Sequence, residues 1–476
     1  MRIVHSHAPQ WRDGESWSVP TEPQVTIGVL DGPDGYQLFG VAAAARLSDG
    51  SFVVVDGGSR TIRRYDTDGR FVWAVGGRGS GPGEFEAPEQ VVVTASDSII
   101  IWDNALYRLT RLTPAGELVD VQTVDRGAIA KAVDPPLYPG TASLLPGGAL
   151  LVRLVEKAKG APAGIFRPRS GALRTSMDGL DTDTLMFFGG EEQETVRAPW
   201  GPFPVALPAA KRTVMTVQPT ESRACIGDQE GPAVACFGPG AARVLVRWDA
   251  DPAPVTADDI DTWRDITKAL YAQKMTEAQL RQMLEQVTVP TTRPPYTRLT
   301  LDRAGNLWVT RTTTTGTSTA PAEHLVFDPT GVWLGRVAVP PLRVLEIGED
   351  YVLGIHRDDL GVEYLLAYQL LKPVQPGAAV QGGLRASMTP SGLLLVNADT
   401  VPLYFAVYDA RVLPFIEWTP CSDPMTCEHI PPNDRRTVAV ARDASDTAMV
   451  FWWRLVPTST GTYAPDSVRA VPVAAR

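Results

Sequence analysis

The amino-acid sequence predicts an all-β protein: a six-bladed β-propeller with a short helical insertion and a C-terminal β-sandwich. Three observations lead to this prediction. Equivalent residues recur 47 positions apart near the N-terminus, short strand-like runs separated by glycine and proline continue through most of the chain, and the repeat stops near residue 372. A repeat of about 40–50 residues built from short strands is typical of propeller blades.

The repeat is clearest in the first two blades. Ala44–Asp56 and Thr61–Gly69 form the first copy, and Ser98–Asp103 and Arg108–Gly116 form the second. In each copy an aspartate ends the first segment and a glycine ends the second, and the corresponding residues lie 47 positions apart. The copies therefore predict two consecutive blades, at about 41–77 and 88–125.

The remaining blades follow the same strand pattern with weaker repetition. Further blades are expected at about 142–167, 205–249, 298–331 and 343–371. The short strand Val25–Val29 precedes the first blade, and we expect it to close the ring by pairing with the last blade.

A helical insertion at about 256–287 interrupts the strands. Thr256, followed by Asp258 and Asp259, predicts a helix start, because a hydroxyl cap and negative charge suit the first turn. Thr276 predicts the start of a second helix. Apolar residues at helical spacing predict that this insertion packs against the propeller, and a partner-binding helix is the alternative.

The segments outside the blades complete the domain plan. Residues 1–24 are expected to form a polar N-terminal extension, 25–372 the propeller, 373–383 a linker rich in proline and glycine, and 384–476 a β-sandwich-like domain. The strands after the linker lack the blade period and differ in length, so they predict a separate module rather than a seventh blade.

Composition sets the class of protein. The 476 residues are 44% hydrophobic and 21% charged, with a formal net charge of −10. Such an acidic chain is a poor candidate for a general nucleic-acid binder, which needs a basic surface. No apolar run of about 18 residues is present, so no transmembrane segment is expected. Met1–His7 also lacks the apolar core of a signal peptide.

The four cysteines form two local pairs, Cys225 with Cys236 and Cys421 with Cys427. Neither pair has the spacing of a zinc or redox Cys-x-x-Cys motif. Both pairs are expected to form disulfides, with four free buried thiols as the alternative. Because disulfides persist in oxidising compartments, we expect an exported protein whose leader peptide is absent from this sequence.

The connection Gly76–Phe85, followed by Pro88, resembles the inter-blade connections of NHL-type propellers. Together with Val54–Asp56, Asn306–Val309 and Phe327–Pro329, it makes residues 20–372 similar to the bacterial six-bladed propellers of the NHL/TolB-like group. That resemblance implies a protein that is periplasmic, secreted or envelope-anchored, mostly in families without an assigned activity. The C-terminal part looks like small uncharacterised exported bacterial β domains.

Equivalent loops of a propeller gather around one mouth of its central channel. This predicts a ligand-binding or partner-binding surface that includes Asp56, Arg60, Asp103, Arg108 and His356. Replacing Arg60 and Arg108 is expected to weaken partner binding and leave folding intact. For the two aspartates, a purely structural role in accepting backbone N–H bonds is favoured. The pair His5 and His7 is expected to lie in a disordered, solvated start rather than to bind a metal.

These observations favour a non-enzymatic binding or scaffolding propeller of the bacterial cell envelope, with a protein, peptide or glycan as its partner. The alternative is a calcium-dependent propeller hydrolase or lactonase, or a lyase, with its site in the central channel. That alternative needs several carboxylates converging on the channel. The inner strand Val41–Ala45 offers none, and Glu89 and Gln90 are the polar residues of the next inner strand. No catalytic residue, metal ligand or cofactor is therefore predicted, and Ca²⁺ belongs to the alternative only.

Overall fold

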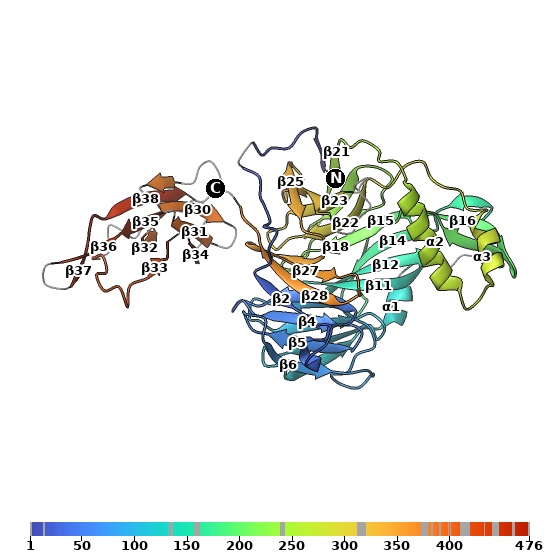
Figure 1. Ribbon diagram of the computed structural model, residues 1–476, viewed down its shortest axis with the longest axis horizontal. Helices are drawn as coiled ribbons and strands as arrows, with labels where there is room; N and C mark the ends of the chain where they lie inside the picture. The colour runs from blue at the N-terminus through green and yellow to red at the C-terminus, as the bar shows by residue number, and fades with distance from the viewer. Residues whose placement is uncertain are drawn as a thin grey trace. The chain divides into compact units, whose positions relative to one another are not determined.

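The computed structural model divides the chain into two compact units, Met1–Leu371 and Lys372–Arg476, each described here by itself (Figure 1). No helix among the described residues is long and apolar enough to cross a membrane. The described residues are 2–474 apart from 13–14, 132, 134–136, 157–161, 239–242, 312–319, 373–378, 382–383, 390–391, 398, 400, 410–418, 433, 440–446 and 459–461.

The described residues of the first unit form six main antiparallel sheets, each built from four strands that are close in sequence except at ring closure. The first three sheets consist of β3 (Val41–Arg46), β4 (Phe52–Asp56), β5 (Thr61–Tyr65) and β6 (Phe71–Gly76); β7 (Pro88–Val93), β8 (Ile99–Asp103), β9 (Arg108–Leu112) and β10 (Leu118–Thr123); and β11 (Leu137–Leu145), β12 (Ala149–Glu156), β14 (Arg169–Thr175) and β15 (Thr182–Gly189).

The other three sheets complete the ring. They consist of β18 (Val214–Val217), β19 (Ala224–Gly227), β20 (Ala233–Phe237) and β21 (Arg243–Trp248); β22 (Tyr296–Leu301), β23 (Leu307–Arg311), β24 (Ala322–Phe327) and β25 (Trp333–Val339); and β26 (Arg343–Ile347), β27 (Tyr351–Arg357), β28 (Glu363–Gln369) and β2 (Val25–Ile27). Strand β1 (Arg2–Ser6) adds a fifth, parallel strand beside β21.

The first strand of each sheet lies innermost. Each innermost strand contacts the next sheet's innermost strand in the order β3, β7, β11, β18, β22 and β26, and β26 contacts β3 again. The sheets therefore form a closed ring, which is the architecture of a β-propeller. The predicted closing strand is confirmed, because β2 pairs with β28 through Val25 and Ala367 (Figure 1).

The hydrophobic core is divided among the junctions between sheets. Six clusters of buried apolar side chains each lie between two neighbouring sheets of the ring. Between the first two sheets, for example, Val53 and Val55 of β4 pack with Ile99 and Ile101 of β8. A blade therefore buries its apolar surface only where a neighbouring blade covers it. Because burying apolar surface contributes about 25 cal/mol per Å² to stability, a complete ring is favoured.

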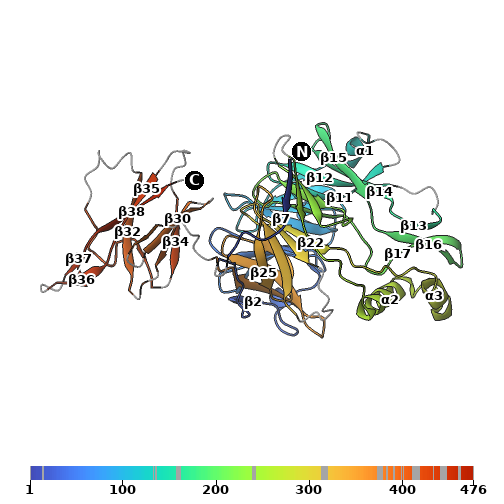
Figure 2. The same cartoon turned by 90° about the horizontal axis from the view of Figure 1, so that it is seen from above.

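An additional three-stranded sheet and two helices form the insertion (Figure 2). Both predicted helix starts are confirmed, because Thr256 and Thr276 each form a capping box. Leu280 and Met283 of the second helix pack on the inserted sheet, whereas the sequence interpretation placed the insertion against the propeller itself. The elements are β13 (Gly164–Phe166), β16 (Gln193–Ala198), β17 (Gly201–Ala206), α2 (Ala257–Tyr271) and α3 (Glu277–Leu284); the short helices α1 (Arg126–Lys131) and η1 (Asp34–Tyr36) lie elsewhere in the first unit.

Two blade assignments from the sequence need correction here. Residues 164–167 were expected in the third blade, but β13 pairs with β16 in the inserted sheet. Residues 205–206, at the start of the expected fourth blade, belong to β17 of the same sheet. The strand propensity of these residues was read correctly, but it carries no information about which sheet a strand joins.

The second unit is a β-sandwich. One apolar cluster joins its two four-stranded sheets, with Leu393 and Leu395 from one sheet and Phe405, Val450 and Trp452 from the other. The first sheet consists of β29 (Ala379–Gln381), β30 (Leu384–Thr389), β31 (Gly392–Asn397) and β34 (Arg435–Val438), the second of β33 (His429–Ile430), β32 (Leu403–Asp409), β35 (Thr447–Trp453) and β38 (Arg469–Ala474), and β36 (Leu455–Pro457) pairs with β37 (Tyr463–Pro465). Of the predicted linker, 379–381 forms β29, and 373–378 and 382–383 lie outside the described residues.

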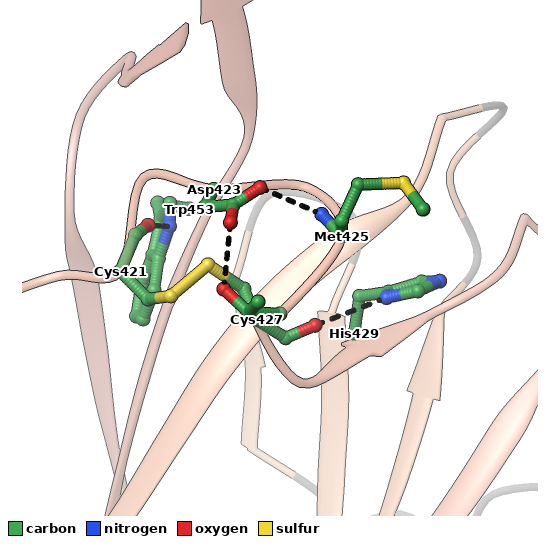
Figure 3. Close-up of a disulfide and its surroundings, with 7 residues drawn as sticks. Cys421, Asp423, Met425, Cys427, His429 and Trp453 are labelled. Carbon is green, nitrogen blue, oxygen red and sulfur yellow. Dashed lines mark hydrogen bonds between the residues drawn. A yellow bond between two sulfur atoms is a disulfide. The ribbon is translucent and has the colours of Figure 1, made fainter.

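Both predicted disulfides are confirmed. Cys225 and Cys236 face each other on the paired strands β19 and β20, and Cys421 is bonded to Cys427. The second disulfide closes a loop in which the indole of Trp453 donates to the carbonyl oxygen of Cys421 (Figure 3). The Asp423 side chain accepts from the backbone N–H of Met425 in the same loop (Figure 3). All four cysteines are paired.

The two compact units predict a specific cleavage pattern. Limited proteolysis should cut within 373–383 and release a stable fragment of roughly 40 kDa, the share of the 51.4 kDa chain that the first unit represents. Mass spectrometry of the fragments would identify the cut. Early cleavage inside the ring, with the junction intact, would contradict the domain plan.

A buried histidine predicts how stability depends on pH. Burial, with a smaller contribution from Arg298, lowers the pKa of His324 to about 4, and its ring contacts the Thr310 hydroxyl. In the unfolded chain the imidazole has its ordinary pKa of about 6.5 and binds a proton below that pH, whereas the folded imidazole stays neutral until about pH 4. The free energy of unfolding therefore falls as the pH is lowered from 6.5 to 4. His324→Gln should reduce this loss of stability by roughly 3 kcal/mol. The test is the pH profile of urea unfolding for both proteins, followed by hydrogen exchange in β23 and β24. Parallel pH profiles would contradict the assignment.

Candidate functional site

The two predicted aspartates organise turns at one end of the first two blades. Asp103 is fully buried, and its two oxygens accept hydrogen bonds from four backbone N–H groups, those of Glu86, Ala87, Ala105 and Leu106, at 2.7–3.1 Å. The matching Asp56 behaves in the same way: it is also fully buried, accepts from the backbone N–H groups of Phe39 and Ser59, and pairs with Arg63 at 3.0 Å. Both carboxylates therefore serve the favoured structural role.

The two predicted arginines both reach the connection between the first two blades. Arg60 donates to the backbone carbonyl of Glu86 at 3.0 Å, and its side chain remains partly exposed. Arg108 is buried and donates to the backbone carbonyls of Ser80 and Glu84. The structure thus brings Arg60, Asp103 and Arg108 together around one connection, where they hold the glycine-rich loop in place.

The fifth predicted residue lies at a different part of the ring. His356, near the end of β27, contacts the backbone carbonyl of Pro341 through its Nδ1 atom at 3.1 Å. Its neighbour Arg357 pairs with Glu363 across the turn between β27 and β28. This turn lies at the end of the blades where the innermost strands begin, because Arg343, the first residue of β26, pairs with Ile355.

Three arginines gather at this mouth of the ring. We call Arg298, Arg343 and Arg357, with Glu363, the mouth cluster. Arg298 lies on the innermost strand β22 and Arg343 on the neighbouring innermost strand β26. Glu363 is buried, and its second oxygen accepts the backbone N–H of Val41 at 2.8 Å. The cluster therefore sets three guanidinium groups against one carboxylate.

The electrostatics of the mouth cluster favour an anion. Surrounding protein lowers the pKa of Arg298, and the charge of Arg343 lowers it further. Arg298 is nevertheless exposed to solvent. Burial also lowers the pKa of Arg343, partly opposed by Glu363 and reinforced by Arg357. An incoming carboxylate or sulfate would relieve this repulsion between like charges.

Arg298 has most of its hydrogen-bonding capacity available. A guanidinium carries five N–H donors. Arg298 donates a long hydrogen bond of 3.4 Å from its Nη1 atom to the carbonyl oxygen of Val344. Arg343, in contrast, donates to the carbonyl oxygens of Val41 and Ala42 and so also holds the ring together.

Two acidic residues also lie near the mouth. Asp358 accepts backbone N–H bonds from Leu360 and Val362 and a bond from the Tyr364 hydroxyl, so its oxygens are occupied. Asp359 is exposed on the same turn. These two carboxylates moderate the positive field of the cluster without lying on the innermost strands that carry Arg298 and Arg343.

The opposite end of the ring also carries charged residues, but these are paired with one another. Glu346 is buried and accepts from the Tyr351 hydroxyl at 2.6 Å, from the Arg303 side chain at 2.9 and 3.0 Å, and from the backbone N–H of Arg46. The guanidinium of Arg46 lies 5.0 Å from the Tyr351 ring centre. This network joins the fifth, sixth and first sheets, so its groups serve the ring rather than a ligand.

The inserted sheet carries a separate aromatic hollow of about 470 Å³, lined by Trp200, Phe203, Tyr271 and Lys274. The rings of Trp200 and Phe203 meet edge to face at 5.6 Å, as do those of Phe203 and Tyr271. Exposed aromatic faces beside a cation can stack on flat apolar surfaces of a ligand. The hollow is open and shallow, and nothing in the structure specifies an occupant.

The sequence pattern does not predict Arg298, Arg343 or Arg357 as site residues. A signal was present, because Arg298 stands in Tyr-Thr-Arg-Leu-Thr-Leu, a strand whose other residues are apolar or neutral. A charged residue within an otherwise apolar or neutral strand is unusual for a buried sheet and marks a position worth testing. The partnership of Arg298 with Arg343 could not be read, since it depends on which strands become neighbours in the ring.

Neither a protein-family model nor a curated protein matches this sequence. Among solved structures, a candidate exported protein from Bacteroides fragilis is 13% identical over 78% of this chain and 99% of its own, with a TM-score of 0.41. A DUF4221 family member from Bacteroides vulgatus is 8% identical over 75% and 99%, with a TM-score of 0.42. A gluconolactonase from Xanthomonas campestris is 12% identical over 74% and 99%, with a TM-score of 0.33. These scores are low, and the assignment of a propeller rests on the sheet topology.

The contrast between the two predicted arginines gives a test. Arg108→Ala should lower the free energy of unfolding by about 2 kcal/mol, because it removes a buried charged donor that holds two backbone carbonyl oxygens of the connection. Arg60→Ala, at a partly exposed site, should change it by about 0.5 kcal/mol or less. Chemical denaturation of both variants measures the difference. Equal, small effects would restore Arg108 as a candidate surface residue.

Proposed function

We propose that this protein is a non-enzymatic binding propeller of the cell envelope, and that its mouth cluster receives an anionic group of a protein, peptide or glycan. The observation that carries the proposal is Arg298, a solvent-exposed guanidinium on an innermost strand beside a second guanidinium. Arginine binds carboxylates through two parallel hydrogen bonds, which give both energy and orientation.

The arrangement of carboxylates supports binding over the calcium-dependent alternative. A calcium ion takes six to eight oxygen ligands. Among the described residues, Asp56 and Asp103 are buried and hydrogen-bonded within turns, while Glu346 and Glu363 pair with arginines. A guanidinium as close to the channel as Arg298 also opposes a cation there. The lactonase or lyase alternative would need carboxylates that this arrangement does not offer at the mouth cluster.

The compartment follows from the two disulfides. Both join cysteines that are close in sequence, and all four cysteines are paired. Such bonds persist in the periplasm or outside the cell and are rare in the cytosol. A protein of the envelope meets peptides and glycans with free carboxylates, which are the chemical class that the mouth cluster suits.

Binding of a labelled oligo-glutamate peptide and of oligogalacturonate, measured by fluorescence anisotropy at low salt, tests the proposal. Arg298→Gln should weaken binding of at least one of the two probes by roughly 10-fold or more, because a hydrogen bond between charged groups contributes about 1.5–3 kcal/mol. Arg70→Gln is the matched control, since Arg70 is exposed on a turn at the other end of the blades.

Two results would overturn the proposal. Equal weakening by Arg70→Gln and Arg298→Gln would mean that the acidic probes meet only diffuse charge. Hydrolysis of an ester or lactone that chelation abolishes, and that Arg298→Gln leaves unchanged, would transfer the function to the enzyme alternative. Replacing Trp200 by alanine in parallel asks whether the aromatic hollow contributes to glycan binding.

A further inference from the structure

The N-terminal strand brings together residues that are far apart in the sequence. Strand β1 runs parallel to β21, with His5 opposite Arg247 and Ser6 opposite Trp248. The start is therefore ordered as a strand and not disordered as expected, while its side chains are largely exposed to solvent, as expected. His7 follows β1 by one residue, as Asp249 follows β21, so the register carries His7 to Asp249. Side chains two residues apart on a strand point to the same face, which places His5 there as well.

The three side chains converge on one point. The Nε2 atom of His5 lies 2.9 Å from one oxygen of Asp249, and the Nδ1 atom of His7 lies 2.8 Å from the other oxygen. The ring centres of the two histidines are 4.3 Å apart. All three ligand atoms lie within 4.8 Å of one another. Bonds of about 2.0–2.2 Å to a tetrahedral ion require donor atoms roughly 3.3 Å apart, so small side-chain rotations would admit an ion.

The donor set selects the class of ion. Two imidazole nitrogens and one carboxylate oxygen suit zinc and neighbouring first-row metals, whereas calcium and magnesium prefer oxygen ligands alone. We propose that His5, His7 and Asp249 form a site for a divalent transition metal of the zinc class. The side chains are 43%, 73% and 60% exposed, so water can complete the coordination and the ion can enter directly from solvent.

A bound ion would fasten the N-terminal strand to the outer edge of the fourth sheet. Strand β1 pairs with β21 alone, and its residues are mostly exposed. Further along, the backbone N–H groups of Gln10 and Trp11 donate to carbonyl oxygens of β25, and the Ser6 hydroxyl accepts from Trp333. The site lies at the start of this crossing, so the metal would stabilise the path of the segment from the fourth sheet to the fifth.

Zinc titration of the full chain without an affinity tag tests the proposal, after removal of metal with a chelator. Calorimetry should show about one saturable zinc site, and cobalt should give the visible absorption of a low-coordinate N/O site. His5→Ala, His7→Ala and Asp249→Asn should each weaken zinc binding roughly 10-fold or more. Zinc should also slow hydrogen exchange of the β1 amides. The matched controls are Asp251→Asn, two residues from Asp249, and His429→Ala in the other unit.

Each contrary outcome is distinct. An absence of saturable binding at micromolar zinc would overturn the proposal. Undiminished affinity in Asp249→Asn would show that the histidine pair chelates zinc without the fold, and would overturn the site as assigned. Loss of binding in the control variants would place the ion elsewhere. Circular dichroism of each variant checks folding, and all three ligand positions are exposed enough to tolerate substitution.

Discussion

The ring depends on how six innermost strands satisfy their unpaired edges. Each innermost strand pairs with one neighbour in its own sheet, so backbone groups on its other edge would remain unbonded inside the protein. Side chains from the preceding blade fill this need. Glu363 accepts from Val41 and Glu346 accepts from Arg46 across the closure of the ring. Other junctions use the same device: Gln90 accepts from Leu144, Asn104 from Ala142, and Thr216 from Leu301.

This constraint also shapes the candidate site. Several acidic and amide groups join one blade to the next, and their oxygens accept backbone N–H bonds, as those of Glu363, Glu346 and Gln90 do. Arginines offer donors alone, so they bond to acceptors such as carbonyl, carboxylate and hydroxyl oxygens and cannot accept a backbone N–H. Arg343 finds carbonyl partners across the ring closure, whereas Arg298 has a single long bond to Val344. Arg298 therefore keeps donors that folding does not use, and this supports the proposed preference of the mouth cluster for an anion.

Local patterns in the sequence predicted much of the fold, and the pairing of distant segments set the limit. The Asp56 and Asp103 repeat, the capped starts at Thr256 and Thr276, and the local cysteine pairs all describe contacts within a few residues or one blade. Residues 164–167 failed as a blade strand because strand propensity does not name a partner strand. In the mouth cluster, Arg298 and Arg343 are more than forty residues apart in the chain. In the metal site proposed above, His5 and His7 are more than two hundred residues from Asp249. No local period encodes those contacts.

The N-terminal segment contains two strands that are held in place differently: β2 closes the ring, and β1 lies on the outer edge of the fourth sheet. Strand β2 is the outermost strand of the last sheet, and it buries Ile27 in the core. This burial offsets the entropy cost of ordering the strand. Strand β1 adds to a sheet that already has four strands and buries little, so its backbone hydrogen bonds must offset the entropy of ordering almost unaided. A strand in that position is held better by a ligand shared between it and its neighbour. The convergence of two histidines of the N-terminal segment on one carboxylate beyond β21 supplies the groups for such a ligand, on the outer edge of the sheet and away from the innermost strands that carry Arg298.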